Sequence, residues 1–240
     1  MENLLSFTSI LVDGLNPTDA VAFTFWTGYA AMAAASVFFI AAMSQVDSKW
    51  KTSMLVSALI TGIAALHYYY MRDAHDAGTI TTAYRYVDWI LTVPLMCVEF
   101  YLILAKAGAT KKLMWQLIGL STLMLVAGYV GESGIGDAVI YGTLSGIAYF
   151  VLAGMLWFGN PQALANKAGG AVLEAYTALK WFVLVGWAIY PIGYMAGTEG
   201  WYSDIFSGLS GQMDLIYNIG DAVNKIGFGL VIYNLAVSSK

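Results

Sequence analysis

Charged residues are scarce in this sequence. Only 11% of its 240 residues are Asp, Glu, Lys or Arg, whereas 59% are hydrophobic. A soluble domain carries about a quarter charged residues, because charged side chains cover much of its surface. The composition therefore argues against an ordinary soluble domain and predicts a protein whose solvent is a lipid bilayer.

Cysteine and basic clusters are equally rare. The single cysteine, Cys97, excludes an internal disulfide framework, and its apolar neighbours predict a packing role. The net charge is −4 and no basic patch exceeds a pair of lysines, so nucleic-acid binding is not expected. No metal-ligand set is predicted. The N-terminus lacks a basic region before its apolar residues, which argues against a signal peptide of the usual form, and residues 1–17 are interpreted as a short external segment.

Long hydrophobic runs are what the sequence does contain. A spanning helix needs about 20 mostly apolar residues, and seven runs meet this requirement, with turn signals between the last six. No linker or internal repeat divides the chain, so we predict an all-α membrane protein with one domain over 1–240. The predicted helices are roughly 18–44, 53–72, 83–105, 112–131, 136–158, 171–196 and 210–236.

The basic residues predict the direction of these helices, because loops rich in Lys and Arg stay in the cytosol. One alternating set of loops and the C-terminus hold nearly all of the lysines, whereas the opposite set holds only Arg72 and Arg85 at helix ends. The N-terminus is therefore expected outside the cell and the C-terminus in the cytosol. The lysines on the predicted cytosolic side are Lys49, Lys51, Lys106, Lys111, Lys112, Lys167 and Lys240.

A few ionisable residues lie inside the apolar runs. Charge within a bilayer is costly, so such residues are functional candidates. A structural ion pair between helices is the alternative for any one of them, but their number favours function. They are His67, Asp88, Glu99, Asp221 and Lys225, with Lys180 near a helix end.

Two helices carry these groups at helical spacing. Asp88, Thr92 and Glu99 are separated by 4 and 11 residues, which places them on one stripe of the third helix. At 1.5 Å per residue, the two acids are about 16 Å apart along the axis. Asp221 and Lys225 share a face of the seventh helix. A lysine this deep needs a counter-ion or loses its proton, and a lysine amine can form a Schiff base with an aldehyde.

Aromatic residues accompany these groups on the third and sixth helices. Each one alone is more often a packing residue, but together they could enclose a flat, apolar cofactor. They are Trp89, Trp187, Tyr190 and Tyr194.

Three segments resemble the microbial (type 1) rhodopsin family, and the similarity runs through nearly the whole chain. Residues 221–229, DAVNKIGFG, are similar to its retinal-binding seventh helix. Residues 85–94, RYVDWILTVP, are similar to its third helix, and residues 187–191, WAIYP, to its sixth. Asp88, Thr92 and Glu99 resemble the pattern of the proton-pumping proteorhodopsin and xanthorhodopsin branches rather than that of sodium or chloride pumps.

The resemblance implies a light-driven outward proton pump of the cell (plasma or inner) membrane, a transporter rather than an enzyme. Lys225 would bind all-trans retinal as a protonated Schiff base, with Asp88 as proton acceptor and Asp221 as second counter-ion. Glu99 would be the proton donor from the cytosolic side. His67 would adjust the proton affinity of the acceptor, and Arg85 would stabilise the outer charges.

The resemblance further implies the chromophore pocket. Its lining would include Trp89, Thr92, Met96, Trp187, Tyr190 and Pro191, and Met96 resembles the residue of green-absorbing relatives. In the xanthorhodopsin branch a glycine opens a window for a carotenoid antenna, and Gly142 matches its position; close helix packing is the other interpretation. A homo-oligomer is also implied.

Two other functions remain open from the residues. The first is a retinal photosensor with a separate transducer, although a sensor does not need the donor Glu99. The second is a colourless transporter or receptor, in which Lys225 would only pair with Asp221. The proton-release group is not fixed by the resemblance; Asp214, seven residues before Asp221, is a candidate.

Overall fold

Seven long helices dominate the computed structural model, which describes residues 19–238. The predicted N-terminal segment and Lys240 lie outside the described residues. Within 19–238, seven helical spans are long and apolar enough to cross a membrane, and no strand is present. This confirms the predicted all-α, seven-helix fold class. The spans are Ala20–Ala42, Ser48–Asp76, Thr82–Ala107, Lys111–Glu132, Ala138–Ala168, Gly170–Gly197 and Met213–Ser238.

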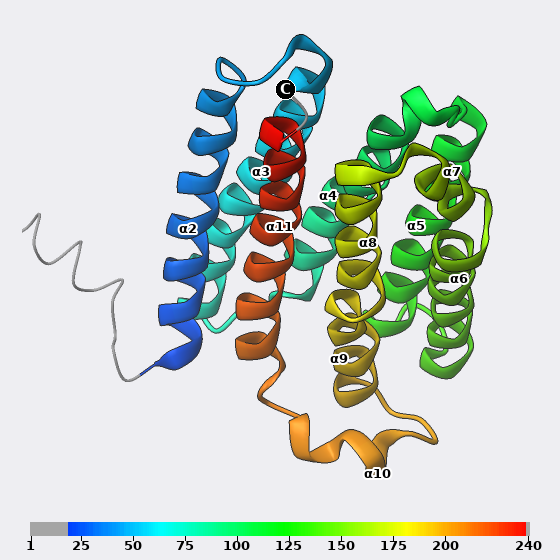
Figure 1. The fold of residues 1–240 in the computed structure, drawn as a ribbon. Helices are drawn as coiled ribbons and strands as arrows, with labels where there is room; N and C mark the ends of the chain where they lie inside the picture. The colour runs from blue at the N-terminus through cyan, green and yellow to red at the C-terminus, as the bar shows by residue number, and fades with distance from the viewer. Residues whose placement is uncertain (1–18, 239–240) are drawn as a thin grey trace, which may run out of the picture.

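The helices form a closed ring in which consecutive spans run antiparallel, whereas the first and the last span, which close the ring, run in the same direction (Figure 1). Helix α2 (Ala20–Ala42) packs on α3 (Lys51–Asp76), which packs on α4 (Thr82–Leu104); α5 (Lys111–Glu132), α6 (Ala138–Phe158) and α8 (Gly170–Leu184) continue the ring. Helix α11 (Met213–Ser238) packs on both α8 and α2 and closes it. Segments at opposite ends of the sequence therefore lie side by side, and α11 faces α3 as well as α2.

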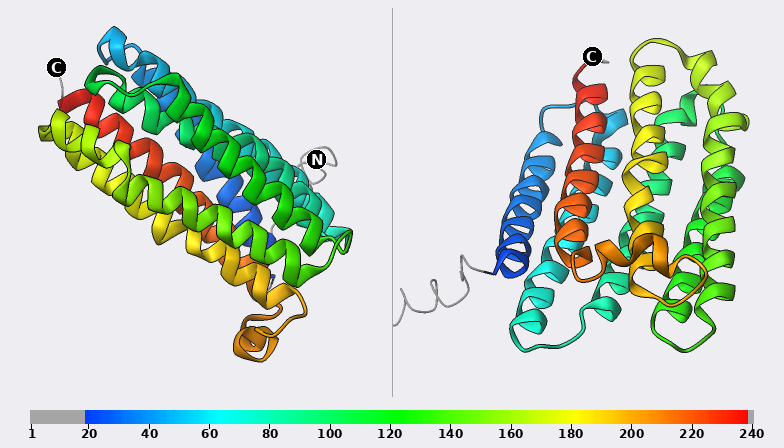
Figure 2. Two further views of the ribbon diagram at one scale, coloured as in Figure 1. Left: turned by 90° about the vertical axis from the view of Figure 1, so that its right-hand side faces the viewer. Right: turned by 90° about the horizontal axis from the view of Figure 1, so that it is seen from below.

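Short helices occupy the two ends of the bundle (Figure 2). At one end, which we call the lysine-rich end, lie η1 (Ser48–Trp50), η2 (Ala105–Ala107) and α7 (Asn160–Ala168). At the opposite, lysine-poor end lie α10 (Ser203–Phe206) and η4 (Ser207–Leu209), in the long connection that projects beyond the helices.

Local sequence explains where several helices begin. The carboxylate of Asp19 accepts hydrogen bonds from the backbone N–H groups of Val21 and Ala22, both at 3.0 Å, and so caps α2. Asp137 caps α6 in the same way through Ile140 N–H at 2.8 Å. Each cap satisfies N–H groups that have no partner within the helix.

The sixth span is interrupted, and a proline accounts for part of the break. Helix α8 is followed by η3 (Gly186–Ala188) and then α9 (Ile189–Gly197). Pro191 has no N–H, so it cannot donate to the carbonyl of Trp187 one turn earlier. The backbone carbonyls that the break frees are bound by side chains of other helices, as described below.

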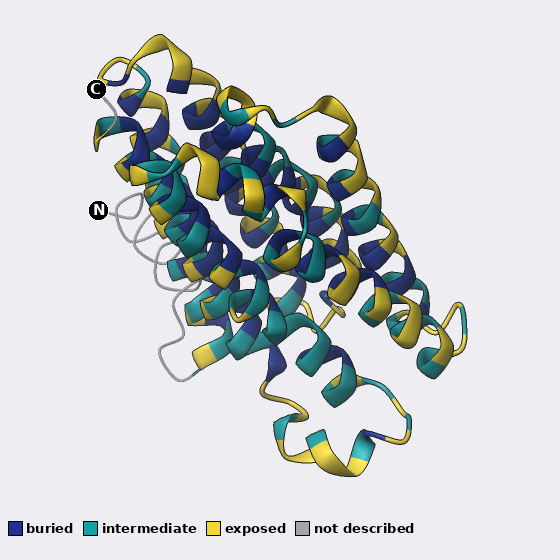
Figure 3. Cartoon of the chain, turned by 45° about the vertical axis from the view of Figure 1, so that its right-hand side comes forward, coloured by how far each residue is buried: buried dark blue, intermediate teal, exposed yellow. Residues whose placement is uncertain are grey.

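The interior and the outer surface differ as expected for a membrane bundle (Figure 3). Buried residues line the inward faces of the helices, whereas large apolar side chains are exposed on the outward faces. A soluble protein rarely exposes so much contiguous apolar surface, but lipid tails solvate it. Examples of exposed apolar residues are Leu66, Val87, Ile147, Phe150 and Val223.

Candidate functional site

Lys225 lies at the centre of the bundle with two carboxylates. Its side chain is only 1% exposed, and Nζ is 2.5 Å from Oδ2 of Asp88 and 2.7 Å from Oδ2 of Asp221. Asp221 precedes Lys225 by one turn of α11, whereas Asp88 reaches it from α4. The structure thus joins the ionisable groups of two predicted helices into one buried cluster, in which two carboxylates share one ammonium group.

The two carboxylates have different further partners. The hydroxyl of Tyr190 donates to Oδ1 of Asp221 at 2.8 Å. Oδ1 of Asp88 is buried and has no hydrogen-bond partner among the described residues. Thr92 does not supply one, because its hydroxyl donates to the backbone carbonyl of Asp88 at 2.9 Å. Asp88 therefore has an unsatisfied oxygen beside the amine, where a carboxylate could take up a proton.

Polar side chains hold the broken sixth span beside this cluster. Asn224, the residue before Lys225, donates from Nδ2 to the carbonyl of Gly186 at 2.8 Å. A Cβ atom at Gly186 would collide with the Asn224 side chain, so this approach requires glycine. The hydroxyl of Tyr149 lies 3.1 Å from the carbonyl of Val183 and 2.8 Å from that of Leu184. Sequence analysis missed both Asn224 and Tyr149, because their partners are backbone atoms of a distant helix.

Arg85 is buried on the lysine-poor side of the cluster. Its Nη2 donates to Oδ1 of Asp214 at 2.7 Å and to Oδ1 of Asn218 at 2.9 Å. The predicted outer cation is thus bonded to a carboxylate nearer the end of the bundle. Asn218 is a third residue that sequence analysis missed, although it lies one turn before the predicted Asp221 on the same face.

His67 lies on α3, near Asp88 but not hydrogen-bonded to it in this structure. Its Nδ1 is 2.9 Å from the carbonyl of Ile63. The ring is close enough to Asp88 for an electrostatic interaction. The structure thus brings His67 near Asp88 without a hydrogen bond between them, and the pairing stays a prediction.

Glu99 is fully buried on α4 toward the lysine-rich end. Neither carboxyl oxygen has a hydrogen-bond partner among residues 19–238, and the buried hydroxyl of Ser57 also has none. Ser53, one turn before Ser57 on α3, is 2% exposed. A carboxyl group in such surroundings is most stable when it keeps its proton. Lys180, the other lysine noted in the sequence, is separate: its Nζ binds Oε1 of Gln162 at 2.5 Å.

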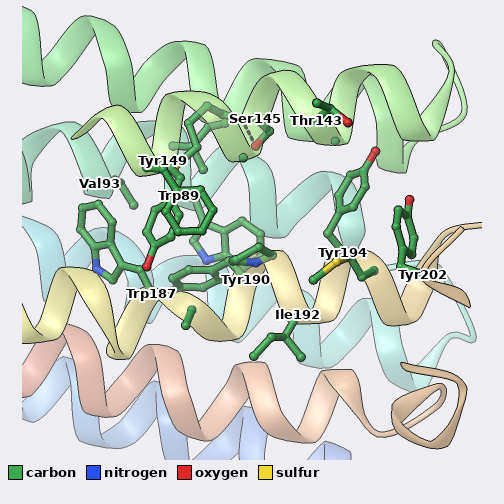
Figure 4. A pocket seen from close by; sticks show the side chains of 18 of the residues that line it. Trp89, Val93, Thr143, Ser145, Tyr149, Trp187, Tyr190, Ile192, Tyr194 and Tyr202 are labelled. Carbon is green, nitrogen blue, oxygen red and sulfur yellow. Dashed lines mark hydrogen bonds between the residues drawn. The ribbon is translucent and has the colours of Figure 1, made fainter. Parts of the chain in front are cut away.

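An aromatic cavity of about 390 Å³ lies beside the ion cluster. Figure 4 shows side chains that line this cavity. Four of the predicted pocket residues line it, and Gly142 lines its wall on α6. Thr92, Met96 and Lys225 are not among the lining residues, although all three are buried. Tyr190 connects the two features, since its ring lines the cavity and its hydroxyl binds Asp221. The four predicted lining residues are Trp89, Trp187, Tyr190 and Pro191.

Glu132 is a fourth residue that sequence analysis did not single out. It ends α5, is half-buried, and its Oε2 accepts a hydrogen bond of 2.7 Å from the hydroxyl of Tyr86, which lines the cavity. No periodicity could have paired these two residues, because they lie 46 positions apart on different helices.

Comparison with known proteins identifies the family. The sequence model of bacteriorhodopsin-like proteins matches residues 19–239, nearly the whole chain. The chain belongs to the bacteriorhodopsin-like family. This rhodopsin is 46% identical over 232 residues to the blue-light absorbing proteorhodopsin of Gamma-proteobacterium Hot 75m4, which covers 93% of this chain and 88% of that relative. It is 43% identical to the green-light absorbing proteorhodopsin of Gamma-proteobacterium EBAC31A08, over 93% of this chain and 89% of the relative.

Solved structures support the same assignment. The crystal structure of a blue light-absorbing proteorhodopsin from Med12 has a TM-score of 0.76 and 40% identity, over 92% of this chain and all of that one. Xanthorhodopsin, described as a light-driven ion pump with dual chromophore, has a TM-score of 0.76 and 32% identity, over 91% of this chain and 93% of that one. The protein is therefore a microbial rhodopsin and a multi-pass protein of the cell membrane.

Membership implies a retinal chromophore, and the residues present fit such a group. The cavity has the size of an ordinary ligand pocket and aromatic walls. Nε1 of Trp187 is buried without a hydrogen-bond partner among the described residues, so it could donate to a bound group. Lys225 supplies a primary amine bonded to Asp221, whose other oxygen binds the cavity-lining Tyr190, and the two carboxylates could balance a cation there.

Proposed function

We propose that this rhodopsin is a light-driven outward proton pump in which Lys225 carries retinal. Retinal, bound to Nζ as a protonated Schiff base, would supply light absorption and an isomerisation that changes the surroundings of that nitrogen. Trp89, Trp187, Tyr190 and Pro191 would hold it, with Thr92 and Met96 in the adjoining core. The task of the chain is ion transport, not enzymatic turnover.

Asp88 is the proposed acceptor of the proton that leaves Nζ of Lys225. Its Oδ2 is already at 2.5 Å, and its Oδ1 has no competing donor among the described residues. Asp221 has a different role, because Tyr190 and Lys225 both donate to it. Those two bonds stabilise Asp221 as an anion, so it acts as the second counter-ion. His67 and Arg85 set the local charge around Asp88.

Glu99 is the proposed donor that returns a proton to Nζ. It lies about 16 Å from Asp88 along α4 on the same helical face, and its buried carboxyl oxygens have no hydrogen-bond partner among the described residues. The proposed acceptor contacts an amine and the proposed donor does not, so the two carboxyl groups have different proton affinities. Proton transfer in one direction requires such a difference. The lysine count predicts that the Glu99 side faces the cytosol, and transfer from Glu99 toward Asp88 would then be outward.

The observation that carries this proposal is the pair of buried acids on one face of α4, of which only one contacts the amine. A photosensor would share the amine cluster but has no use for the second acid. To test the proposal, cells that contain the protein and retinal are illuminated in unbuffered salt while the external pH is recorded. We expect acidification that a protonophore abolishes. Colour without acidification would favour the sensor, and a colourless protein would favour the receptor or transporter without retinal.

We further propose that the cavity admits a second, carotenoid chromophore beside Gly142, in a protein that forms homo-oligomers in the bilayer. The cavity extends from Trp89 and Trp187 to Thr143, Trp201 and Tyr202 near the lysine-poor end. The solved xanthorhodopsin is a relative with two chromophores. An elongated apolar molecule would suit this shape.

A further inference from the structure

Asp214 has an unusual position at the lysine-poor end of the ion cluster. It lies in the first turn of α11, and its side chain is 40% exposed. Its Oδ1 receives three hydrogen bonds: from Arg85 Nη2 at 2.7 Å, Arg85 Nε at 3.2 Å and the Thr81 hydroxyl at 3.2 Å. None of these three hydrogen bonds reaches Oδ2. Oδ1 is therefore held by Arg85 and Thr81, whereas Oδ2 can exchange a proton.

Arg85 is held rigidly between this acid and the buried cluster. Its side chain is only 4% exposed, and the guanidinium carbon lies 5.2 Å from the ring centres of both Phe25 and Tyr217. Asn218 accepts from Nη2 at 2.9 Å and is itself bound to Thr24, through Nδ2 at 3.0 Å. A guanidinium stays protonated at every ordinary pH, so a fixed positive charge lies next to the route from Asp88 to the lysine-poor surface.

The acids on this route are ordered by exposure. Asp88 and Asp221 are fully buried, whereas Asp214 is half-exposed. Asp214 precedes Asp221 by seven residues, or about 10 Å along the axis of α11, and so lies on nearly the same face. Resting on the proposed pump function, we propose that Asp214 is the exit relay, which takes the proton that leaves Asp88 and passes it to external water.

The transfer is a simple proton exchange between two carboxyl groups through water. The O–H bond at Asp88 breaks and an O–H bond forms at Oδ2 of Asp214, which becomes neutral while Asp88 becomes an anion again. The neutral Asp214 then no longer balances the charge of Arg85, whereas Asp88 is an anion again. The proton on Asp214 leaves for bulk water, and the positive charge of Arg85 opposes its return.

Three other charged or titratable groups lie around Asp214. Arg85 faces it from α4, while Glu132 of α5 and Tyr217 of α11 are close enough to interact with it electrostatically. Glu132 is the only other carboxyl group among these, and it is already bonded to Tyr86 at 2.7 Å. Its substitution therefore belongs in the test as the competing relay.

The test measures when the proton reaches bulk water. Wild type, Asp214→Asn, Asp214→Glu and Glu132→Gln are reconstituted with retinal in lipid nanodiscs and excited by a flash, with a pH-sensitive dye in the medium. The matched control is Asp204→Asn, an exposed acid of α10 at the same end. In Asp214→Asn we expect the dye signal to be delayed at least about tenfold, since an acid–base relay contributes about 10²–10⁴-fold. The absorbance change that reports proton arrival at Asp88 should keep its wild-type rate.

Two further readouts separate a relay from a merely structural role. Asp214→Glu should restore the timing, and millimolar external acetate, a mobile carboxylate, should shorten the delay in Asp214→Asn, whereas a displaced Arg85 would not respond to acetate. Unchanged timing in Asp214→Asn, or an equal delay in Asp204→Asn or Glu132→Gln, would overturn the relay while wild-type pumping persists. Absence of light-driven acidification in wild type would instead overturn the pump and the relay together.

Discussion

Asp88 and Glu99 are both fully buried on α4, yet only Asp88 touches a cation. Its Oδ2 is 2.5 Å from Nζ of Lys225, whereas neither oxygen of Glu99 has a hydrogen-bond partner within residues 19–238. A buried carboxylate is stabilised by a nearby opposite charge, and one without partners is costly. This difference in environment is the basis for giving the two acids opposite tasks.

Lys225→Ala is expected to abolish the visible absorption band that appears when retinal is added. Lys225 supplies the buried amine at the carboxylate pair, and alanine has no group that could form the bond to retinal. The measurement is an absorption spectrum of the purified protein. The control is Lys180→Ala, which removes another lysine that is only 9% exposed. This variant should keep its colour. A coloured Lys225→Ala protein would refute the assignment of the attachment site.

Asp88→Asn is expected to shift the absorption band to longer wavelength and to stop light-driven acidification. The loss of one negative partner at 2.5 Å lowers the excitation energy of a cation at Nζ, and the proposed acceptor is gone. The proton signal should fall at least about 100-fold, the lower bound for loss of a positioned acid–base group. Asp204→Asn is the control for a general effect of charge. Persistent acidification by Asp88→Asn would show that another group accepts the proton.

Glu99→Gln is expected to leave the colour nearly unchanged and to slow recovery of the absorption after a flash by about tenfold or more. Glutamine matches the shape of Glu99 but has no acidic proton to give, so reprotonation must draw on bulk solvent. Recovery should then depend strongly on pH, and azide, a small mobile acid, should partly restore it. Glu174→Gln, an exposed acid at the same end of the bundle, is the control. A pH-independent, wild-type recovery in Glu99→Gln would exclude the donor role.

Gly146→Trp is expected to prevent binding of a hydroxylated carotenoid without loss of the retinal band. Gly142 and Gly146 both line the cavity, but a Cβ atom at Gly142 would collide with Tyr194, whereas nothing lies within 4 Å of one at Gly146. Gly142→Trp should also block binding, although with a loss of packing. Gly154→Trp, on the same helix and away from the cavity lining, is the control. The readout is carotenoid-sensitised excitation; binding that survives Gly146→Trp would exclude this cavity as the carotenoid site.

Asp19→Ala is expected to lower stability by about 1 kcal/mol, the usual effect of losing a helix cap. Asp19→Asn should cost less, because asparagine also caps helices and the lost ion pair with His75 at 2.9 Å is partly exposed. The pKa of Asp19 is lowered below its ordinary value of 3.8, mainly by the hydrogen bond from the N–H of Ala22 and next by the hydrogen bond with the His75 side chain. The benefit of the charge is therefore complete above that value and disappears as pH falls through the lowered pKa. The thermal bleaching temperatures of wild type and Asp19→Asn should become equal in that acidic range. A difference that persists there would show that the charge of Asp19 is not the source of the stabilisation.

Much of the fold follows from local pattern. The seven apolar runs predicted the seven spans, since each helix must satisfy its own backbone hydrogen bonds in lipid. The break after Leu184 was not anticipated, although Pro191 is present, because its exact place depends on Asn224 and Tyr149 from other helices.

The sequence by itself determined which residues share a helical face, because helical periodicity is a property of neighbouring residues. It predicted that Asp88 shares a helical face with Glu99, and that Asp221 shares one with Lys225. These four residues stood out because charged residues are scarce in the apolar runs. Only the tertiary structure decided that Arg85 bonds to Asp214, that Tyr190 bonds to Asp221 and that Tyr86 bonds to Glu132. These contacts depend on how each helix is rotated and tilted against helices distant in sequence. That rotation is set by the packing of the whole ring, which no single segment encodes.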